Sequence, residues 1–420
     1  MTLHRTSSPV AIATAALVVV LAAASALGCS KGTSSQGDGG GVSSDAAARD
    51  AEPRSRDASL IDDVYTLPLD AADAFWVSPK SDAGQMQPPP RGAEWLHVDG
   101  PSIVDPHGNA VRLFGVNRSG TEYACVQGFG IFDGPSDAAS IQAIQSWHAN
   151  AVRVPLNEDC WLGINGVAPE YGGGAYQKAI AAYVELLLEN GVYPIVDLHW
   201  SAPGGSLATG QQAMPDADHS VTFWREVATT FRDQANVILE LFNEPWPDNN
   251  QDTDEAWQCW ENGGACSSIS YTVAGMQTLV TTVRETGAGN LLLLGGVEYS
   301  NGLSQWAKYK PTDPANNLAA AWHIYPENPC YTETCWNGAP ATLAMTYPIV
   351  ATEVGDSDCD GTFPTSVMTF LDARSQSSLG WTWDTFGTAC GNYSLVTDYN
   401  GTPNGAYGMA FKTHFAGVAP

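Results

Sequence analysis

The sequence predicts an α/β protein, a closed (β/α)8 TIM barrel, from three observations. Short apolar runs of strand length recur eight times along the chain. Segments with the apolar spacing of one helical face lie between them, for example at 176–190 and 220–234. Uninterrupted apolar strands are typical of a parallel sheet buried on both faces. No glycine-rich G-x-G-x-x-G turn follows the first strand, so the sequence favours a barrel over an open dinucleotide-binding sheet.

The eight expected strands follow a short hairpin. This hairpin pairs 96–98 with 103–104 around Gly100-Pro101. The strands are expected at 111–117, 151–155, 193–199, 237–243, 291–296, 319–323, 348–353 and 380–383. The chain has 420 residues, 44% of them hydrophobic, which is enough to fill the core of one such barrel.

The N-terminal residues have the pattern of an export signal. An apolar run from Val10 to Leu27 follows a weakly basic start, and small residues lie near its end. The end of the run, Ser25-Ala26-Leu27-Gly28-Cys29, resembles a bacterial lipoprotein signal, in which the chain is cut before a cysteine that is then lipidated. We therefore expect residues 1–28 to be a signal peptide and Cys29 a lipid anchor. An ordinary cleaved signal and a retained transmembrane anchor are the alternatives.

Each of these outcomes places the rest of the chain outside the cytoplasm, at the cell surface or outer membrane if it is a lipoprotein and otherwise secreted. Residues 29–90 are expected to form a flexible tether, because 30–59 are almost all Gly, Ser, Ala and Asp. Some apolar side chains at 60–77 suggest that the end of the tether docks on the domain. Pro88-Pro89-Pro90 marks the boundary, so residues 91–420 are expected to form the barrel domain.

The charge of the chain excludes one class of partner. Asp and Glu number 45 against 18 Lys and Arg, a formal net charge of −27. Such a field repels phosphate backbones and anionic membrane surfaces, so nucleic acid is not expected as a partner. Membrane contact is expected only through the lipid anchor, whereas a neutral ligand is unaffected.

The cysteines indicate disulfides in an oxidising compartment. Without Cys29, eight of the nine remain, an even number. Proximity in sequence suggests one set of pairs among the 105 possible connectivities. These pairs are Cys125–Cys160, Cys259–Cys266, Cys330–Cys335 and Cys359–Cys390.

Metal binding is not expected from the sequence. No CxxC pair with zinc spacing occurs. The segment Asp356–Gly361 begins like a calcium loop, but Val367 stands where the EF-hand pattern requires Glu. A solvated or substrate-contacting rim loop is the favoured interpretation of this segment.

Polar side chains stand at the ends of the expected strands, where they would make poor core. They are Arg153, His199, Asn243, Glu244, His323, Tyr325, Glu353 and Trp383. All strand C-termini of a (β/α)8 barrel meet at one face, where functional groups gather. Residues that are more than 200 positions apart are therefore expected to converge on one pocket.

Two motifs in this set carry a resemblance to a known family. Asn243-Glu244-Pro245 follows the fourth strand, and Glu353 ends the seventh in Ala351-Thr352-Glu353-Val354-Gly355. From about Trp95 to the C-terminal region the chain resembles glycoside hydrolase family 5, in the clan that includes cellulases. The resemblance implies a β-linked polysaccharide or oligosaccharide as partner. We also expect no cofactor and a monomeric chain.

The resemblance implies roles for the two carboxylates. Glu244 is expected to be the general acid/base, with a pKa raised by burial and nearby negative charge. Glu353 is expected to be the nucleophile, kept ionised by donors such as Arg153. The family retains configuration, so the carboxyl oxygens should lie about 5 Å apart.

The resemblance also implies a substrate-binding set of Arg153, His199, Asn243, His323, Tyr325 and Trp383. Asn243 would bind the sugar 2-hydroxyl and Tyr325 would hold Glu353. The two histidines would orient sugar hydroxyls and the carboxylates. Trp383 would be the platform beneath the sugar, with Trp381 as its rival.

The motifs determine the identity of the substrate less closely than they determine the fold and the two carboxylates. We expect endo-action on a β-1,4-linked glucan, because aromatic loop residues suit an open cleft; these are Trp246, Trp257, Trp260, Trp306 and Trp336. β-Mannanase, xylanase or another β-glycanase activity on the same core stays open. From another class, an inactive carbohydrate-binding lipoprotein is possible, whereas the histidine spacings give a metal-dependent hydrolase no support.

Overall fold

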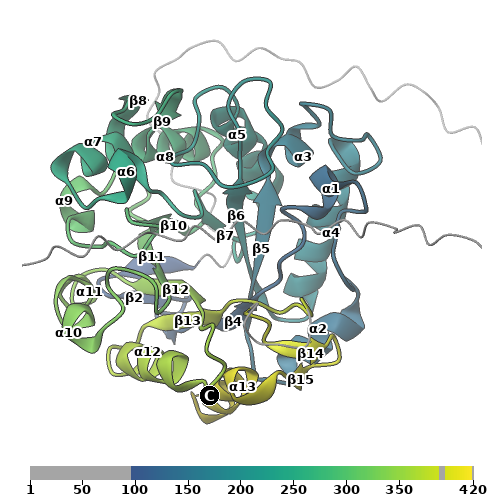
Figure 1. The fold of residues 1–420 in the computed structure, drawn as a ribbon, viewed down its shortest axis with the longest axis vertical. Helices are drawn as coiled ribbons and strands as arrows, with labels where there is room; N and C mark the ends of the chain where they lie inside the picture. Colours follow the sequence, from purple (N-terminus) through teal and green to yellow (C-terminus); the bar gives the residue numbers. More distant parts are fainter. Residues whose placement is uncertain (1–95, 387–392, 419–420) are drawn as a thin grey trace, which may run out of the picture. The chain divides into compact units, whose positions relative to one another are not determined.

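The computed structural model describes residues 96–386 and 393–418, and the barrel prediction is confirmed. Eight strands close on themselves in the order β10-β11-β12-β13-β4-β5-β6-β7, and every neighbouring pair is parallel (Figure 1). The strands are β4 (Phe114–Asn117), β5 (Ala151–Asn157), β6 (Tyr193–Trp200), β7 (Ile238–Glu240), β10 (Leu292–Gly295), β11 (Leu318–Ile324), β12 (Ile349–Val354) and β13 (Ser377–Gly380).

Helices surround the barrel in the described part of the chain (Figure 1). They are α1 (Ala124–Gln127), α2 (Ala138–Gln145), α3 (Glu158–Leu162), α4 (Gly174–Glu189), α5 (Ser220–Phe231), α6 (Pro247–Asn250), α7 (Asp254–Asn262), α8 (Met276–Glu285), α9 (Trp306–Tyr309), α10 (Glu333–Trp336), α11 (Ala339–Leu343), α12 (Thr362–Asp372) and α13 (Gly405–Val418). The two helices expected from the sequence are α4 and α5. None of the described helices is both long enough and apolar enough to cross a membrane.

The eighth strand does not lie where the sequence predicts it. The expected segment was 380–383, but β13 spans Ser377–Gly380 and ends where the prediction begins. Two serines open this strand, and the hydroxyl of Ser377 accepts a hydrogen bond from the backbone N–H of Leu113 at 2.9 Å. Because these polar residues are buried through hydrogen bonds, the strand has no continuous apolar run in the sequence that would predict it.

Strand alternation divides the core into an inner and an outer layer. In β5, Val152 and Val154 belong to the cluster that packs on the helices, while Ala151 belongs to a second cluster inside the barrel. The same alternation points Arg153 inward, because successive strand residues face opposite sides. The interior is therefore apolar at the strand beginnings and polar toward their C-terminal ends.

The predicted hairpin is present and has a third strand. β1 (His97–Asp99), β2 (Ser102–Val104) and β3 (Ala110–Val111) form an antiparallel sheet. Leu96 and Ile103 belong to the inner cluster, so this hairpin covers the N-terminal end of the barrel. Two small antiparallel pairs lie outside the barrel, β8 (Gly263–Ala265) with β9 (Thr272–Ala274) and β14 (Val396–Asp398) with β15 (Thr402–Pro403).

Three predicted disulfides are confirmed. They are Cys125–Cys160, Cys259–Cys266 and Cys330–Cys335. Cys359 is also disulfide-bonded, but Cys390, its predicted partner, lies outside the described residues. The expected signal peptide, Cys29 and the tether, including its docked end, lie outside them as well.

Candidate active site

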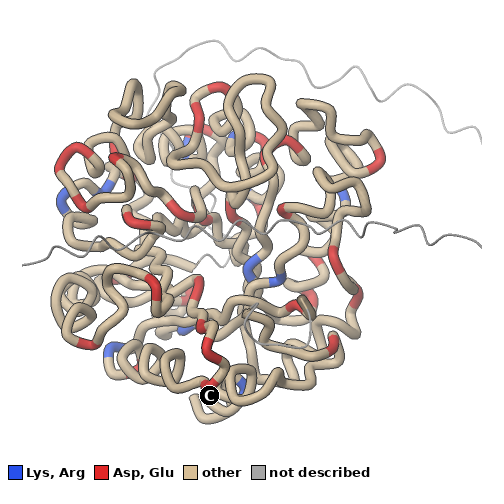
Figure 2. The backbone as a smooth tube through the Cα atoms, in the orientation of Figure 1, with Lys and Arg blue, Asp and Glu red and all other residues tan. Residues whose placement is uncertain are grey.

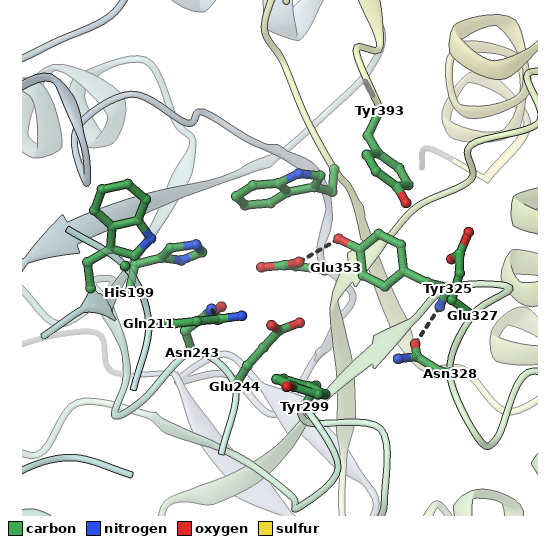
Figure 3. Close-up of a pocket in the computed structure, with 13 residues that line it drawn as sticks. His199, Gln211, Asn243, Glu244, Tyr299, Tyr325, Glu327, Asn328, Glu353 and Tyr393 are labelled. Carbon is green, nitrogen blue, oxygen red and sulfur yellow. Dashed lines mark hydrogen bonds between the residues drawn. The ribbon is translucent and has the colours of Figure 1, made fainter. Parts of the chain in front are cut away.

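An open cleft of about 590 Å³ lies at the C-terminal ends of the barrel strands (Figure 3). It contains polar and aromatic side chains from six strand ends and the loops that follow them. The lining residues are His199, Trp200, Gly210, Gln211, Asn243, Glu244, Tyr299, Tyr325, Glu327, Asn328, Glu353, Trp381 and Tyr393. Five of the eight residues predicted for the site are among them.

Glu244 and Glu353 face each other in this cleft (Figure 3). Glu244 follows β7 and Glu353 lies on β12. One carboxylate oxygen of each lies within 4.8 Å of the other. This spacing matches two carboxyl groups about 5 Å apart and leaves no room for the water that an inverting glycosidase places between them.

Arg153 lies beneath the carboxylates and is fully buried. Its Nη1 donates to Glu353 Oε1 at 2.7 Å, and its Nε donates to Glu240 Oε2 at 2.6 Å. Nη2 donates to Asp197 Oδ2 at 3.0 Å. Nη1 and Nη2 also donate to the amide oxygens of Asn117 and Asn243, at 3.0 and 2.8 Å. All five N–H groups of the guanidinium can be used in this way.

The structure therefore corrects the prediction that Arg153 binds substrate. No donor is left over for a sugar, and Arg153 does not line the cleft. Burial alone would lower the pKa of Arg153, but the charges of the three neighbouring carboxylates raise it above its usual value. Arg153 is a fixed positive charge that positions Glu353 and Asn243.

Tyr325 holds the second oxygen of Glu353. Its hydroxyl donates to Glu353 Oε2 at 2.5 Å (Figure 3). Both carboxylate oxygens of Glu353 therefore have a donor, because Oε1 accepts from Arg153. Burial first, and then the charges of Glu353 and Glu244, raise the pKa of Tyr325 well above its usual value. The phenol thus stays protonated and can act only as a donor to the carboxylate.

His323 is fully buried and contacts carboxylates, not the cleft. Its Nδ1 lies 2.9 Å from Glu244 Oε1 and its Nε2 lies 3.1 Å from Thr352 Oγ1. Burial opposes the imidazolium, but the charge of Glu353 and hydrogen bonds to two further carboxylates raise the pKa of His323 to about 10. The part of the prediction that gave His323 contacts with sugar hydroxyls is therefore wrong.

The same hydrogen bond corrects the prediction of a raised Glu244 pKa. Burial raises this pKa, as expected, but the hydrogen bond from His323 and the positive charge on it outweigh burial and lower it. The positive charge of His323 therefore has a larger effect on Glu244 than the negative charges near it. The lowered pKa of Glu244 and the raised pKa of His323 both favour a carboxylate next to an imidazolium.

His199 and Asn243 line the cleft as predicted. His199 Nδ1 lies 3.0 Å from Asp197 Oδ2, and its ring stacks on Trp381 with centroids 5.4 Å apart and planes at 4°. Burial lowers the pKa of His199, but Asp197 outweighs burial and raises it. The amide of Asn243 donates to Gln211 Oε1 at 2.7 Å.

Trp381, not Trp383, lines the cleft. Trp383 is 1% exposed and packs against Trp147 with ring centroids 4.9 Å apart. Its backbone N–H donates to the carbonyl oxygen of Asn117 at 2.7 Å. Because β13 ends at Gly380, the residues after it follow a loop, and the loop directs Trp381 to the cleft and Trp383 into the core.

The loop tryptophans expected to widen the cleft are mostly core residues. Trp257, Trp260 and Trp306 are fully buried, and Trp336 is 3% exposed. The indole N–H of Trp260 donates to the carbonyl oxygen of Gly295 at 2.8 Å. These rings attach the loops to the barrel, and the aromatic cleft residues are others, namely Trp200, Tyr299, Tyr325, Trp381 and Tyr393.

Several site residues were not predicted. Asp197 and Glu240 interrupt the apolar runs of β6 and β7, and a charge inside a buried strand is a signal that could have identified both. Gln211 and Tyr299 reach the cleft from loops, where no sequence periodicity marks them.

Comparison with known proteins gives one family. The profile of the family described as Cellulase (glycosyl hydrolase family 5) matches residues 104–387. Among curated relatives, endoglucanase E-5 of Thermobifida fusca is 23% identical over 68% of this chain and 54% of its own length. The manganese-dependent endoglucanase Eg5A of Phanerodontia chrysosporium is 28% identical over 50% of each chain. The chain spans 28% to 62% of the length of the first three curated relatives that it matches.

Solved structures share the fold. The β-glucanase SdGluc5_26A of Saccharophagus degradans, in complex with cellotetraose, has a TM-score of 0.60 and is 19% identical over 82% of this chain and 99% of its own. A β-mannanase of Thermomonospora fusca has a TM-score of 0.56 and is 16% identical over 78% of this chain and 95% of its own. The family profile spans more than half of the chain, including both carboxylates and the barrel that carries them. This chain belongs to glycosyl hydrolase family 5.

Proposed function

We propose that the protein is a retaining, endo-acting glycoside hydrolase that cleaves a β-1,4-linked glucan. The observation that carries the proposal is the pair Glu244 and Glu353, whose nearest oxygens lie within 4.8 Å in an open cleft. Family membership and the endoglucanase relatives support the choice of glucan. An open cleft lets a chain pass through, which favours internal cleavage over removal of terminal sugars.

The reaction has two displacement steps. Glu353 attacks the anomeric carbon while Glu244 protonates the leaving oxygen, which forms a glycosyl-enzyme ester and releases the first product. Glu244 then takes a proton from water, and the resulting hydroxide displaces Glu353 and releases a sugar of the original configuration. Arg153 and Tyr325 hold the attacking oxygens of Glu353 in place. Asn243, fixed by Arg153, faces the 2-hydroxyl of the sugar.

The proton for the first step lies one hydrogen bond away from Glu244. It is the Nδ1 proton of His323, whose Nδ1 lies 2.9 Å from Glu244 Oε1. A sugar in the cleft excludes water from Glu244 and so disfavours its charged form. The proton then moves to Glu244, which becomes the neutral acid that faces the glycosidic oxygen.

The test uses Glu353→Ala and Glu244→Gln with release of reducing sugar from glucan, mannan and xylan. We expect the wild type to act on the glucan, and each variant to lose several orders of magnitude in kcat while binding of a cello-oligosaccharide remains. Activity on mannan with none on glucan would replace the substrate. Binding without turnover by the wild type would instead identify an inactive carbohydrate-binding protein.

We also propose that the chain is exported and anchored through Cys29. The apolar segment before Cys29 and the disulfides of the barrel domain support an oxidising, extracytoplasmic location. Labelled palmitate should enter the wild-type chain in a bacterial host. Labelling of the Cys29→Ser variant to the same extent would refute the anchor.

A further inference from the structure

The loop that joins β12 to α12 carries three aspartates at alternate positions, Asp356, Asp358 and Asp360. One carboxylate oxygen from each lies within 4.8 Å of the others. Calcium binds oxygen ligands at about 2.3–2.6 Å, so two oxygens on one ion can be at most about 5 Å apart. The three side chains are therefore already gathered within the reach of a single ion.

Asp356 supplies a second and independent observation. Its side chain is fully buried, and its Oδ2 is without a hydrogen-bond partner among the described residues, although its Oδ1 accepts from the backbone N–H of Asp358 at 3.0 Å. A buried acceptor that is left without a partner is destabilising, and more so when the group is charged. An ion at this position would satisfy it.

The net charge around the loop is negative, which also favours a bound cation. Within residues 96–386 and 393–418, none of the ion pairs joins a Lys, Arg or His to any of the three aspartates. Asp358 and Asp360 are exposed and line a surface groove, so an ion has an entry path. Three carboxylates gathered without a positive partner repel one another.

We propose that Asp356, Asp358 and Asp360 bind a divalent cation of the calcium class. The buried Asp356 oxygen forms the floor of the site, and the two exposed carboxylates close over the ion. Gly361 follows with φ of 75°, a left-handed conformation that turns the chain into α12. Carboxylate ligands in an irregular loop suit calcium better than magnesium, which demands a near-octahedral shell.

Val367 explains why the sequence pattern argued against this site. It occupies the position of the bidentate glutamate in an EF-hand and is fully buried in the core. The site therefore lacks that ligand, and water completes the coordination shell on the exposed side. We expect a dissociation constant on the order of 10⁻⁴ to 10⁻³ M, as in extracellular calcium modules.

The loop between β12 and α12 lies beside the cleft, so an ion bound to it would stabilise the wall of the cleft. It begins two residues after Glu353, and the hydroxyl of Ser357 donates to Glu327 Oε1 at 3.1 Å. Glu327 lines the cleft. On the other side the Tyr407 hydroxyl interacts with the backbone of Asp356 and donates to the carbonyl oxygen of Trp381. The ion would thus brace a loop that contacts two parts of the cleft.

The test is calcium titration of the EDTA-treated full chain by calorimetry and by thermal unfolding. We expect one ion per chain and, at about 100 times Kd, a rise in Tm of about 4 °C. Asp358→Asn and Asp360→Asn should each weaken calcium binding at least tenfold and remove the rise in Tm. Both side chains are exposed, so both variants should fold.

Asp105→Asn is the matched control, because Asp105 also accepts backbone N–H groups in a turn but lies in the N-terminal sheet region. It should bind calcium like the wild type. Three results would overturn the proposal: no calcium binding by the wild type, unchanged binding by the loop variants, or an equal response to magnesium. None of these measurements depends on catalysis, so they stand apart from the proposed activity.

Discussion

At the scale of single residues, Arg153 organises the site. It satisfies three buried carboxylates and two amide oxygens with one guanidinium, so removing any partner leaves an unpaired group in the barrel interior. The planar geometry of the guanidinium matters as much as its charge, because the five acceptors lie in different directions. The guanidinium thus holds Glu353 and Asn243 in position although Arg153 itself does not line the cleft.

Arg153→Lys should show this dependence. A lysine has three donors on one atom and cannot reach five acceptors, so we expect kcat/KM to fall at least about 100-fold. The free energy of unfolding should fall by roughly 3–5 kcal/mol, the usual cost of breaking a buried ion pair. Steady-state kinetics and urea denaturation measure the two effects.

Arg225→Lys is the control, because its ion pair with Glu285 is more than half exposed on both sides. Its effect on the free energy of unfolding should be within about 0.5 kcal/mol. An Arg153→Lys variant that behaves like this control would contradict the role of the guanidinium.

His323 should make stability depend on pH. Its pKa is about 10 in the folded protein, where the charge of Glu353 outweighs the effect of burial, and about 6.5 in an unfolded chain. A raised folded pKa gives a stabilisation that is complete below about pH 6.5 and lost as the pH rises to about 10. The loss should amount to roughly 3–5 kcal/mol.

Urea denaturation between pH 6 and 10 measures this loss. His323→Gln cannot bind the proton, so its stability should fall less over the same range. His107→Gln, a change at an exposed imidazole, should keep the wild-type slope. Equal slopes in the wild type and His323→Gln would show that the buried imidazole is neutral throughout.

At the scale of elements, the sequence predicted the strands in which an apolar run continues beside one or two buried polar side chains, and it failed at β13, where two buried serines open the strand. β6 and β11 match their expected ranges within a few residues, because their side chains face the core on both sides. The eighth strand was predicted too far toward the C-terminus, because Ser377 and Ser378 belong to it although they are polar. Their burial depends on hydrogen bonds and on the pairing of β13 with β4, which no local sequence pattern reveals. The site residues on strand ends were therefore predictable, whereas Gln211 and Tyr299 come from loops whose paths depend on tertiary packing.

Alanine substitutions at Trp381 and Trp383 test whether the eighth strand ends at Gly380 or extends to Trp383. Trp381→Ala should raise KM at least about tenfold with little change in stability, because its ring lines the cleft. Trp383→Ala should leave a cavity beside Trp147 and cost roughly 3–5 kcal/mol of unfolding free energy. Kinetics with a soluble glucan and urea denaturation separate the two. The reverse assignment, with Trp383 controlling KM, would restore the strand that the sequence predicted.

At the scale of the whole molecule, Asp and Glu are spread along the backbone of the described residues, and Lys and Arg are fewer (Figure 2). The formal net charge of the chain is −27. A neutral polysaccharide is indifferent to this field, whereas an anionic derivative is repelled until salt screens the repulsion.

The KM for carboxymethylcellulose should therefore fall as NaCl rises from about 20 to 200 mM, because the Debye length shortens over that range. The KM for hydroxyethylcellulose, which is neutral, should stay constant under the same conditions. An equal salt response with both substrates would point to a change in the protein and against long-range repulsion.

In the proposed mechanism Glu353 forms a covalent bond with the sugar while Glu244 transfers the proton. Proton NMR of a cello-oligosaccharide during hydrolysis tests this most directly, because it identifies the anomer that is released first. We expect the β-anomer to be released first and the α-anomer to follow only by mutarotation. Release of the α-anomer first would mean a single inverting displacement, and would contradict a mechanism built on two carboxylates within 4.8 Å of each other.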